Sequence, residues 1–213
     1  MPLTNYALNQ IISHKRSELN EARAKSIAPE LTDFQHWFAN FPLNAMFGRR
    51  TRLNPITWLF VRRAHDCLED YEEACKLLEQ AATDRGSISY FRTLRRFENC
   101  LGFVYQSLTL LVTLDHPKLF KRGDGSVYER INRIYNTGRH YDPRKLPNGY
   151  LHALWLENEG IYGIDESGET SVSFEELREQ VLELGQFAKS IVDGTIFVDS
   201  QNSEAMPPGQ DKL

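Results

Sequence analysis

Two long stretches of helical periodicity occupy the middle of the chain and constrain its fold more than any other feature. The first, residues 54–86, opens with Asn-Pro, a pair suited to the N-cap and first position of a helix. The second, residues 87–114, is apolar almost all round in its second half, as expected of a central core helix. Apolar side chains on the first recur every three or four positions: Trp58, Val61, Ala64, Cys67, Leu68, Tyr71, Cys75 and Leu78. Because these faces must pack against other helices, the sequence predicts an all-α bundle.

Two shorter helices are expected before the long pair. Residues 3–25 carry apolar residues at helical intervals ahead of Pro29. An aromatic-rich helix begins at Asp33 and is expected to stop near Pro42, since proline removes a backbone donor and clashes with the preceding turn.

After the long pair, another helix and an extended segment are expected. Ser126 is a good N-cap for a helix from 127 to roughly 137 or 141. Residues 151–162 are predicted to be extended or hairpin-like, and residues 165–170 to supply a turn. This small excursion separates the bundle's earlier helices from its last one.

The last helix has the clearest start signal. Ser173 with Glu176 three residues later is typical of a capping box, and the helix should reach about Val192. Its inward residues are predicted to be Leu177, Val181, Leu184, Ala188 and Ile191. The sequence therefore predicts one α-helical domain, residues 1–195, with about five main helices, and a disordered tail at 196–213.

Composition is that of a soluble globular protein, with 41% hydrophobic and 25% charged residues. No run of about 18 apolar residues occurs, and the N-terminus is polar almost at once, so neither a membrane span nor a signal peptide is expected. Cys67, Cys75 and Cys100 lack metal-site spacing and favour buried thiols. These features together predict a cytoplasmic protein.

Charge is distributed unevenly along the chain. Residues 49–145 hold 18 Lys/Arg and 12 Asp/Glu, whereas residues 157–199 hold 2 and 11. A partner that carries phosphates would therefore meet the middle of the chain. The alternative is that helical faces are simply solvated this unevenly.

Several kinds of chemistry have no support in the sequence. Gly-rich phosphate loops, a GxSxG elbow and HExxH are all absent, and the histidines include no pair four residues apart. The acidic run at 66–73 is expected to be a solvated helix face. No cofactor and no metal are therefore expected.

The segment 129–140 is the strongest candidate for function. On a helix, Arg133, Asn136 and His140 share a face, because seven residues make nearly two turns. A fixed cation, a polar orienter and an imidazole are what metal-free phosphoryl chemistry on RNA requires. The same residues also fit a hydrogen-bonded helix end without chemistry.

The spacing from Arg133 to His140 resembles the R-x4-6-H signature of the HEPN superfamily (higher eukaryotes and prokaryotes nucleotide-binding). Its surroundings are similar too: a proline-bearing loop, the segment 155–161 that opens with Trp155, and the Ser-Phe-Glu-Glu-Leu start of the last helix. The resemblance covers about residues 90–193.

The resemblance implies a helical bundle that often forms a homodimer, and a metal-independent endoribonuclease acting in stress, toxin or phage-defence roles. The RNA 2′-hydroxyl would attack the adjacent phosphate, with His140 as general base or acid. Arg133 would stabilise the phosphorane oxygens, and Asn136 would orient the imidazole or a phosphate oxygen. An antitoxin or other regulatory protein would be the usual partner.

One position departs from the common active pattern, in which an arginine directly precedes the polar residue. Tyr135 stands there, so Arg133 fills the role only under the longer spacing, and Arg139 is an alternative cation. Arg130, Arg139 and Tyr135 are the candidates for RNA binding. Members of the superfamily without catalysis act as binding modules, so the alternative function is a non-catalytic helical RNA- or protein-binding module.

Overall fold

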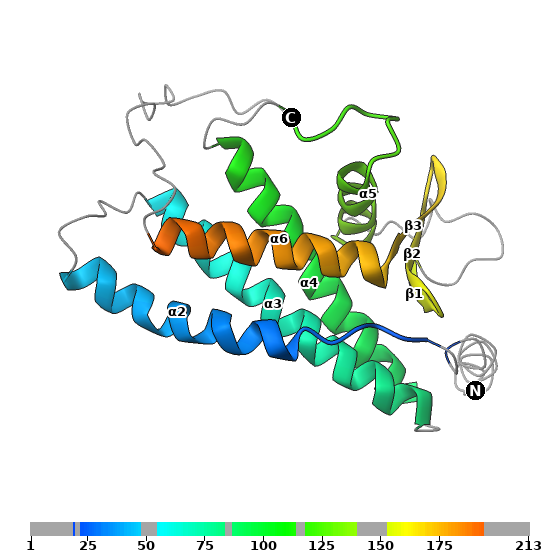
Figure 1. Ribbon diagram of the computed structural model, residues 1–213. Coiled ribbons are helices and arrows are strands. Elements are labelled where there is room, and N and C mark those ends of the chain that lie inside the picture. The colour runs from blue at the N-terminus through cyan, green and yellow to red at the C-terminus, as the bar shows by residue number, and fades with distance from the viewer. Residues whose placement is uncertain are drawn as a thin grey trace, which may run out of the picture.

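The computed structural model describes residues 19, 22–47, 55–83, 87–113, 118–139 and 153–193, which form five helices and three strands. In chain order these are α2 (Ala28–Phe47), α3 (Pro55–Thr83), α4 (Ser87–Thr113), α5 (Val127–Arg139), β1 (Leu154–Glu157), β2 (Gly160–Asp165), β3 (Gly168–Ser173) and α6 (Phe174–Val192). Four long helices pack together, and α5 lies with the sheet at one end of them (Figure 1). No helix in these ranges has the length and apolar character needed to cross a membrane.

The core is centred on α3 and α4, which pack side by side and pass behind α6 in the view of Figure 1. The phenol of Tyr71 is fully buried and donates to the carbonyls of Lys25, at 3.2 Å, and Phe174, at 3.3 Å. The ring of Phe97 on α4 stacks on that of Phe174, with centroids 4.9 Å apart. The start of α6 is thereby held against both central helices.

The three strands form an antiparallel sheet in the order β1-β2-β3. Leu156 pairs with Ile161, which pairs with Val172, and all three side chains are fully buried. The Leu156 N–H donates to the phenol oxygen of Tyr90 on α4, so the sheet is joined directly to the bundle. At Gly160, an added Cβ would lie 2.3 Å from the Val172 carbonyl oxygen, which explains why no side chain is accommodated there.

The predicted capping box of the last helix is confirmed. Ser173 Oγ accepts from the Glu176 N–H at 3.1 Å, and the Glu176 carboxylate accepts from the Ser173 N–H at 3.0 Å. The helix ends at Val192 as predicted. All five residues expected to face inward are buried: Leu177, Val181, Leu184, Ala188 and Ile191.

A mostly helical fold with a small extended segment before the last helix is also confirmed. The segment is larger than predicted, however, because residues 168–173 form β3 where a turn over 165–170 was expected. The turn itself occupies only Glu166 and Ser167. Thr170 and Val172 alternate with more exposed neighbours and are buried, which is strand periodicity.

Two expectations near the N-terminus are wrong. The helix expected over 3–25 does not reach Lys25, since residues 22–27 are not helical; most of its range lies outside the described residues. The next helix starts at Ala28, not Asp33, and continues past Pro42 to Phe47. Proline already has a helical φ, and the helix continues at the loss of one backbone hydrogen bond.

Two burial predictions for the long helices also need correction. Trp58, expected in the buried stripe of α3, is 40% exposed, while the other residues of that stripe are buried. In the second half of α4, Val104 and Leu108 are buried, but Thr109 and Val112 face outward. The tail expected to be disordered, 196–213, lies outside the described residues.

Candidate functional site

The motif helix, α5, is fixed at both its start and its inner face. Ser126 Oγ accepts from the Glu129 N–H at 3.3 Å, the predicted N-cap. The Glu129 carboxylate turns back to the N–H groups of Gly123 and Gly125 instead of closing a capping box with Ser126. Ile131, like Ile134 one turn later, is fully buried. These contacts set the direction in which the polar side chains of α5 project.

Arg133 is joined to the sheet. Its Nε and one terminal nitrogen donate to the two carboxylate oxygens of Asp165, at 2.9 and 2.7 Å, and that same nitrogen donates to the Gly168 carbonyl at 2.9 Å. These hydrogen bonds hold the pKa of Asp165 below its usual range. Arg133 therefore fastens α5 to the β2–β3 turn.

Arg130 makes a second junction of the same kind. Its terminal nitrogens donate to both carboxylate oxygens of Glu176, at 3.0 and 2.6 Å, and to the Ser171 carbonyl at 2.7 Å. Hydrogen bonding to Arg130 lowers the pKa of Glu176 to about 2. The capping box of α6 is thus also the anchor point of α5.

The remaining members of the predicted catalytic set are placed only in part. Asn136 is exposed, and its amide donates to Asn132 Oδ1 at 2.9 Å, one turn back on α5. His140 lies outside the described residues. The described part of the set therefore consists of a sheet-bound Arg133 and an outward Asn136.

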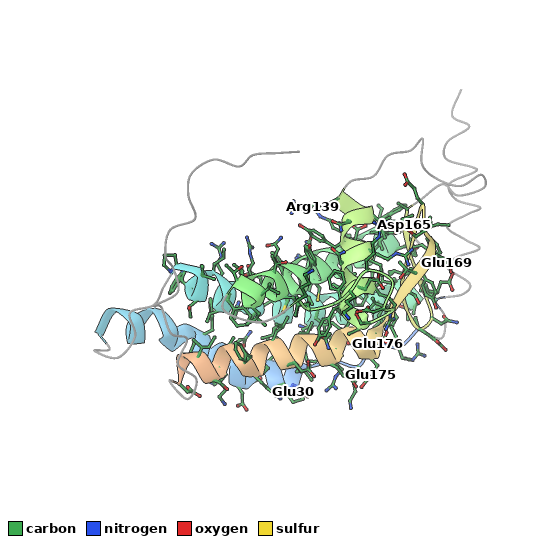
Figure 2. The ribbon with its side chains drawn as sticks, turned by 90° about the horizontal axis from the view of Figure 1, so that it is seen from above. Glu30, Arg139, Asp165, Glu169, Glu175 and Glu176 are labelled. Atoms are coloured by element: carbon green, nitrogen blue, oxygen red, sulfur yellow. The ribbon has the colours of Figure 1, made fainter. Side chains whose placement is uncertain are left out.

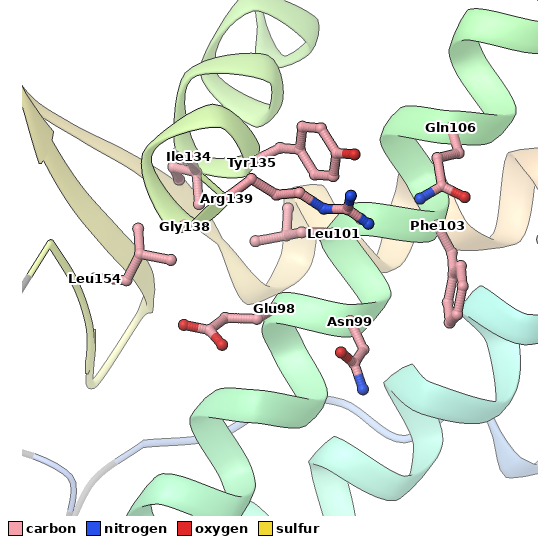
Figure 3. A pocket seen from close by; sticks show the side chains of 11 residues that line it. Glu98, Asn99, Leu101, Phe103, Gln106, Ile134, Tyr135, Gly138, Arg139 and Leu154 are labelled. Carbon is pink, nitrogen blue, oxygen red and sulfur yellow. The ribbon is translucent and has the colours of Figure 1, made fainter. Parts of the chain in front are cut away.

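The three residues predicted to bind RNA separate into two environments. Arg130 is held by the sheet and α6, whereas Tyr135 and Arg139 face α4 (Figure 3). The Tyr135 ring stacks on Tyr105 of α4 with centroids 4.4 Å apart, and the Arg139 guanidinium carbon lies 5.4 Å from the Tyr135 centroid. Arg139 is exposed and forms no ion pair with any carboxylate in the described ranges.

Beside this stack is a hollow of about 300 Å³ between α4 and the end of α5. Glu98, Asn99 and Gln106 of α4 bring polar groups to it, and Leu154 of β1 lies at its edge (Figure 3). Burial raises the pKa of Glu98, and the charge of Arg95 opposes that shift. The hollow thus combines an aromatic stack, an exposed guanidinium, two amides and a carboxyl.

Two glycines, Gly102 and Gly138, also line this hollow. An added Cβ at Gly102 would lie 3.5 Å from the Tyr135 ring, and one at Gly138 would lie 2.9 Å from Leu154 Cδ1. The backbone of Gly138 in the last turn of α5 thus lies close to the Leu154 side chain of β1. Local sequence patterns could not predict the contact between Tyr105 and Tyr135, because the two residues are 30 positions apart.

Charged side chains lie on both sides of the molecule in the view of Figure 2. Arg139 lies on the opposite side from Glu30 and Glu175 in the view of Figure 2. On α4 the charged residues are Arg92, Arg95, Arg96 and one carboxylate, Glu98. Asp165, however, is labelled close to Arg139, so acidic side chains are present on both sides (Figure 2).

The acidic run of α3 is not the simple solvated face that was expected. Asp70 is buried and pairs with Arg96 at 2.6 Å, and Glu72 is buried and accepts from the Ile27 N–H at 2.9 Å. Both carboxylates join α3 to neighbouring segments. Within the described ranges, no group of three potential metal ligands occurs.

The cysteines are buried and free, as predicted. Burial raises the pKa of the Cys67 and Cys100 thiols well above the usual range, and that of Cys75 to about 12. Neutral, buried thiols are inert, so these residues belong to the core.

A comparison of this chain with protein-family models, curated proteins and solved structures found no match.

Proposed function

We propose that this chain is a helical RNA-binding module, similar to the HEPN superfamily, that holds RNA where α4 meets the end of α5. The observation that carries the proposal is the exposed Arg139 over the Tyr135–Tyr105 stack, beside a polar hollow. An arginine without a carboxylate partner keeps its donors available for phosphate. Aromatic rings beside a cation are a common platform for unpaired bases.

The three arginines of α5 make different contacts, and this difference supports the proposal. The donors of Arg130 and Arg133 are directed to Glu176 and Asp165, so these residues position the helix. Among the three arginines of α5, Arg139 is the one that is exposed. The excess of basic residues in the middle of the sequence favours a polyanionic partner in the same region.

Fluorescence anisotropy with a labelled single-stranded RNA tests the proposal. Wild type should bind at about 50 mM salt and lose affinity as salt rises. Arg139→Gln should weaken binding about 5- to 10-fold and reduce the salt dependence by about one phosphate contact. Lys189→Gln on α6 changes the net charge equally and should have little effect. Equal losses in both variants, or no binding by wild type, would remove the proposal.

Metal-independent RNA cleavage is the second candidate, favoured by the position of Arg139 directly before His140. His140 would accept the 2′-hydroxyl proton as that oxygen attacks phosphorus, and Arg139 would stabilise the charge on the phosphorane. The bond to the 5′-oxygen then breaks, that oxygen takes up the proton held by His140, and a 2′,3′-cyclic phosphate remains on the other product. A homodimer would bring two such motifs together.

Incubation of RNA with wild-type protein in EDTA tests this candidate. It predicts 2′,3′-cyclic phosphate ends that His140→Ala does not generate. Intact RNA, or equal cleavage by the His140→Ala variant, would rule out catalysis, and RNA binding would remain as the proposed function.

A further inference from the structure

One face of α4 is polar and lies between α3 and α5. Arg92, Arg95, Asn99 and Gln106 on this face follow one another at intervals of three, four and seven residues, which places them in a line along the helix. Asn99 lines two neighbouring hollows, one of about 360 Å³ with Arg92 and Arg95 and one of about 300 Å³ with Arg139. We call the combined surface the α4 groove; it consists of Arg92, Arg95, Asn99, Gln106, Tyr135 and Arg139.

The α4 groove has α4 as its floor and the neighbouring helices as its sides. On the α3 side, Arg96 pairs with Asp70, and the Arg63 guanidinium carbon lies 5.1 Å from the centroid of the Phe103 ring. On the other side, the Tyr105–Tyr135 stack packs α5 against α4. Figure 3 shows the Arg139 and Tyr135 side chains extending from α5 toward α4. The floor and both sides of the groove are therefore formed by helices that pack against one another.

Positive charge is available at both ends of the α4 groove. Arg92 and Arg95 are exposed and, like Arg139, pair with no carboxylate among the described residues. Two carboxyl groups border the groove, Glu73 on α3 and Glu98 on α4. Burial raises the pKa of Glu98, so this carboxyl keeps its proton to a higher pH than a solvated glutamate does. A phosphate chain would therefore meet cations at each end of the groove.

We propose that the α4 groove takes one unpaired RNA strand of up to about six nucleotides, an inference that rests on the RNA binding proposed above. Arg92 and Gln106 are about 21 Å apart along the helix axis, at 1.5 Å per residue. A stacked strand advances about 3.4 Å per nucleotide. Arg92 and Arg95 contact phosphates at one end, and Arg139 and Tyr135 hold a phosphate and a base at the other.

The aromatic end of the groove distinguishes a single strand from other polyanions. A duplex keeps its bases paired, so its base faces do not reach a tyrosine ring without unpairing. An acidic peptide would engage the arginines but has no base to stack on Tyr135. The groove therefore favours unpaired nucleic acid over both.

A length series tests the size of the site. Labelled oligouridines of 3, 4, 6, 8 and 12 nucleotides, titrated with the full chain, should bind more tightly up to about six nucleotides and then level off. A hairpin duplex should bind at least 10-fold more weakly than the hexamer, and polyglutamate should not displace the hexamer. Affinity that levels off at three nucleotides, a duplex that binds as well, or displacement by polyglutamate would overturn the inference.

Variants separate this inference from the proposed function. Arg92→Gln/Arg95→Gln should weaken hexamer binding about 10-fold and leave trimer binding nearly unchanged, whereas Arg139→Gln weakens both. The control is Lys76→Gln/Lys189→Gln, which removes the same charge elsewhere. If Arg139→Gln lowers affinity but Arg92→Gln/Arg95→Gln does not, the RNA strand does not follow α4. In that case the α4 groove proposal fails and the proposed RNA binding stands. If wild type binds no RNA, both fail.

Discussion

Arg133 and Asp165 form a two-fold hydrogen-bonded ion pair that joins the motif helix to the end of β2. The partners are only 25% and 28% exposed, and Arg133 also donates to the Gly168 carbonyl. Arg133, which was the predicted catalytic arginine, thus forms an ion pair that holds the fold together. Arg139, six residues later, projects toward α4 instead. These two arginines of α5 therefore point in different directions, Arg133 to the sheet and Arg139 toward α4.

Replacing Arg133 should lower stability more than RNA affinity. Arg133→Lys keeps the charge but cannot form the paired hydrogen bonds, and we expect a loss of about 1–2 kcal/mol in the free energy of unfolding. Urea denaturation measures this, and anisotropy should show RNA binding within about two-fold of wild type. Arg62→Lys, on an exposed side chain of α3, is the control. Unchanged stability with a large loss of RNA affinity would instead assign Arg133 to the ligand.

Glu176 should make stability depend on acid pH. Arg130 lowers its folded pKa to about 2, from an ordinary value of 4.5. A carboxyl with a lowered folded pKa stabilises the fold fully above its unfolded pKa, and this contribution is lost as pH falls toward the folded value. Wild type should therefore lose stability more steeply between pH 4.5 and 2 than Glu176→Gln does. Parallel curves for the two proteins in urea denaturation would contradict this.

Local sequence signals predicted the helices well where the capping residues and the hydrophobic periodicity agree. The Ser173–Glu176 capping box fixed the start of α6, and the Asn-Pro pair correctly located the start of α3 at Pro55. β3 was not predicted because its Gly-Glu-Thr-Ser sequence also suits a turn. In the folded protein Thr170 is buried, which favours the strand conformation. Local preference does not exclude either conformation for so short a segment.

The candidate site was less predictable, because its contacts join distant segments. The partner of Arg133 is 32 positions away, and that of Arg130 is 46 positions away. Helical spacing placed Arg133 and Asn136 near one another but could not say which arginine has a carboxylate partner. That depends on how the sheet folds against α5, which only the tertiary structure supplies.

Tyr135 should contribute to RNA binding through its ring. Tyr135→Phe keeps the stack on Tyr105 and the contact with Arg139, so affinity for the hexamer should stay within about two-fold of wild type. Tyr135→Ala removes the ring, and a lost base stack of about 1–3 kcal/mol corresponds to at least a 5-fold loss. Anisotropy measures both, with circular dichroism to check the fold. A large loss in Tyr135→Phe would assign the contact to the hydroxyl group instead.

Removing the negative charge of Glu98 should strengthen RNA binding. The charged groups around this carboxyl are Arg95 on its own helix and Arg139 from α5, while β1 contributes the apolar Leu154. Because burial raises its pKa, Glu98 carries less charge as pH falls, and its repulsion of phosphate is greatest at high pH. Glu98→Gln should therefore raise affinity about 2- to 3-fold at pH 8, and this gain should become smaller as the pH is lowered. Glu179→Gln on α6 is the control and should change affinity little at any of these pH values. Equal gains in the two variants would mean that net charge, and not the position of Glu98 in the groove, sets the effect.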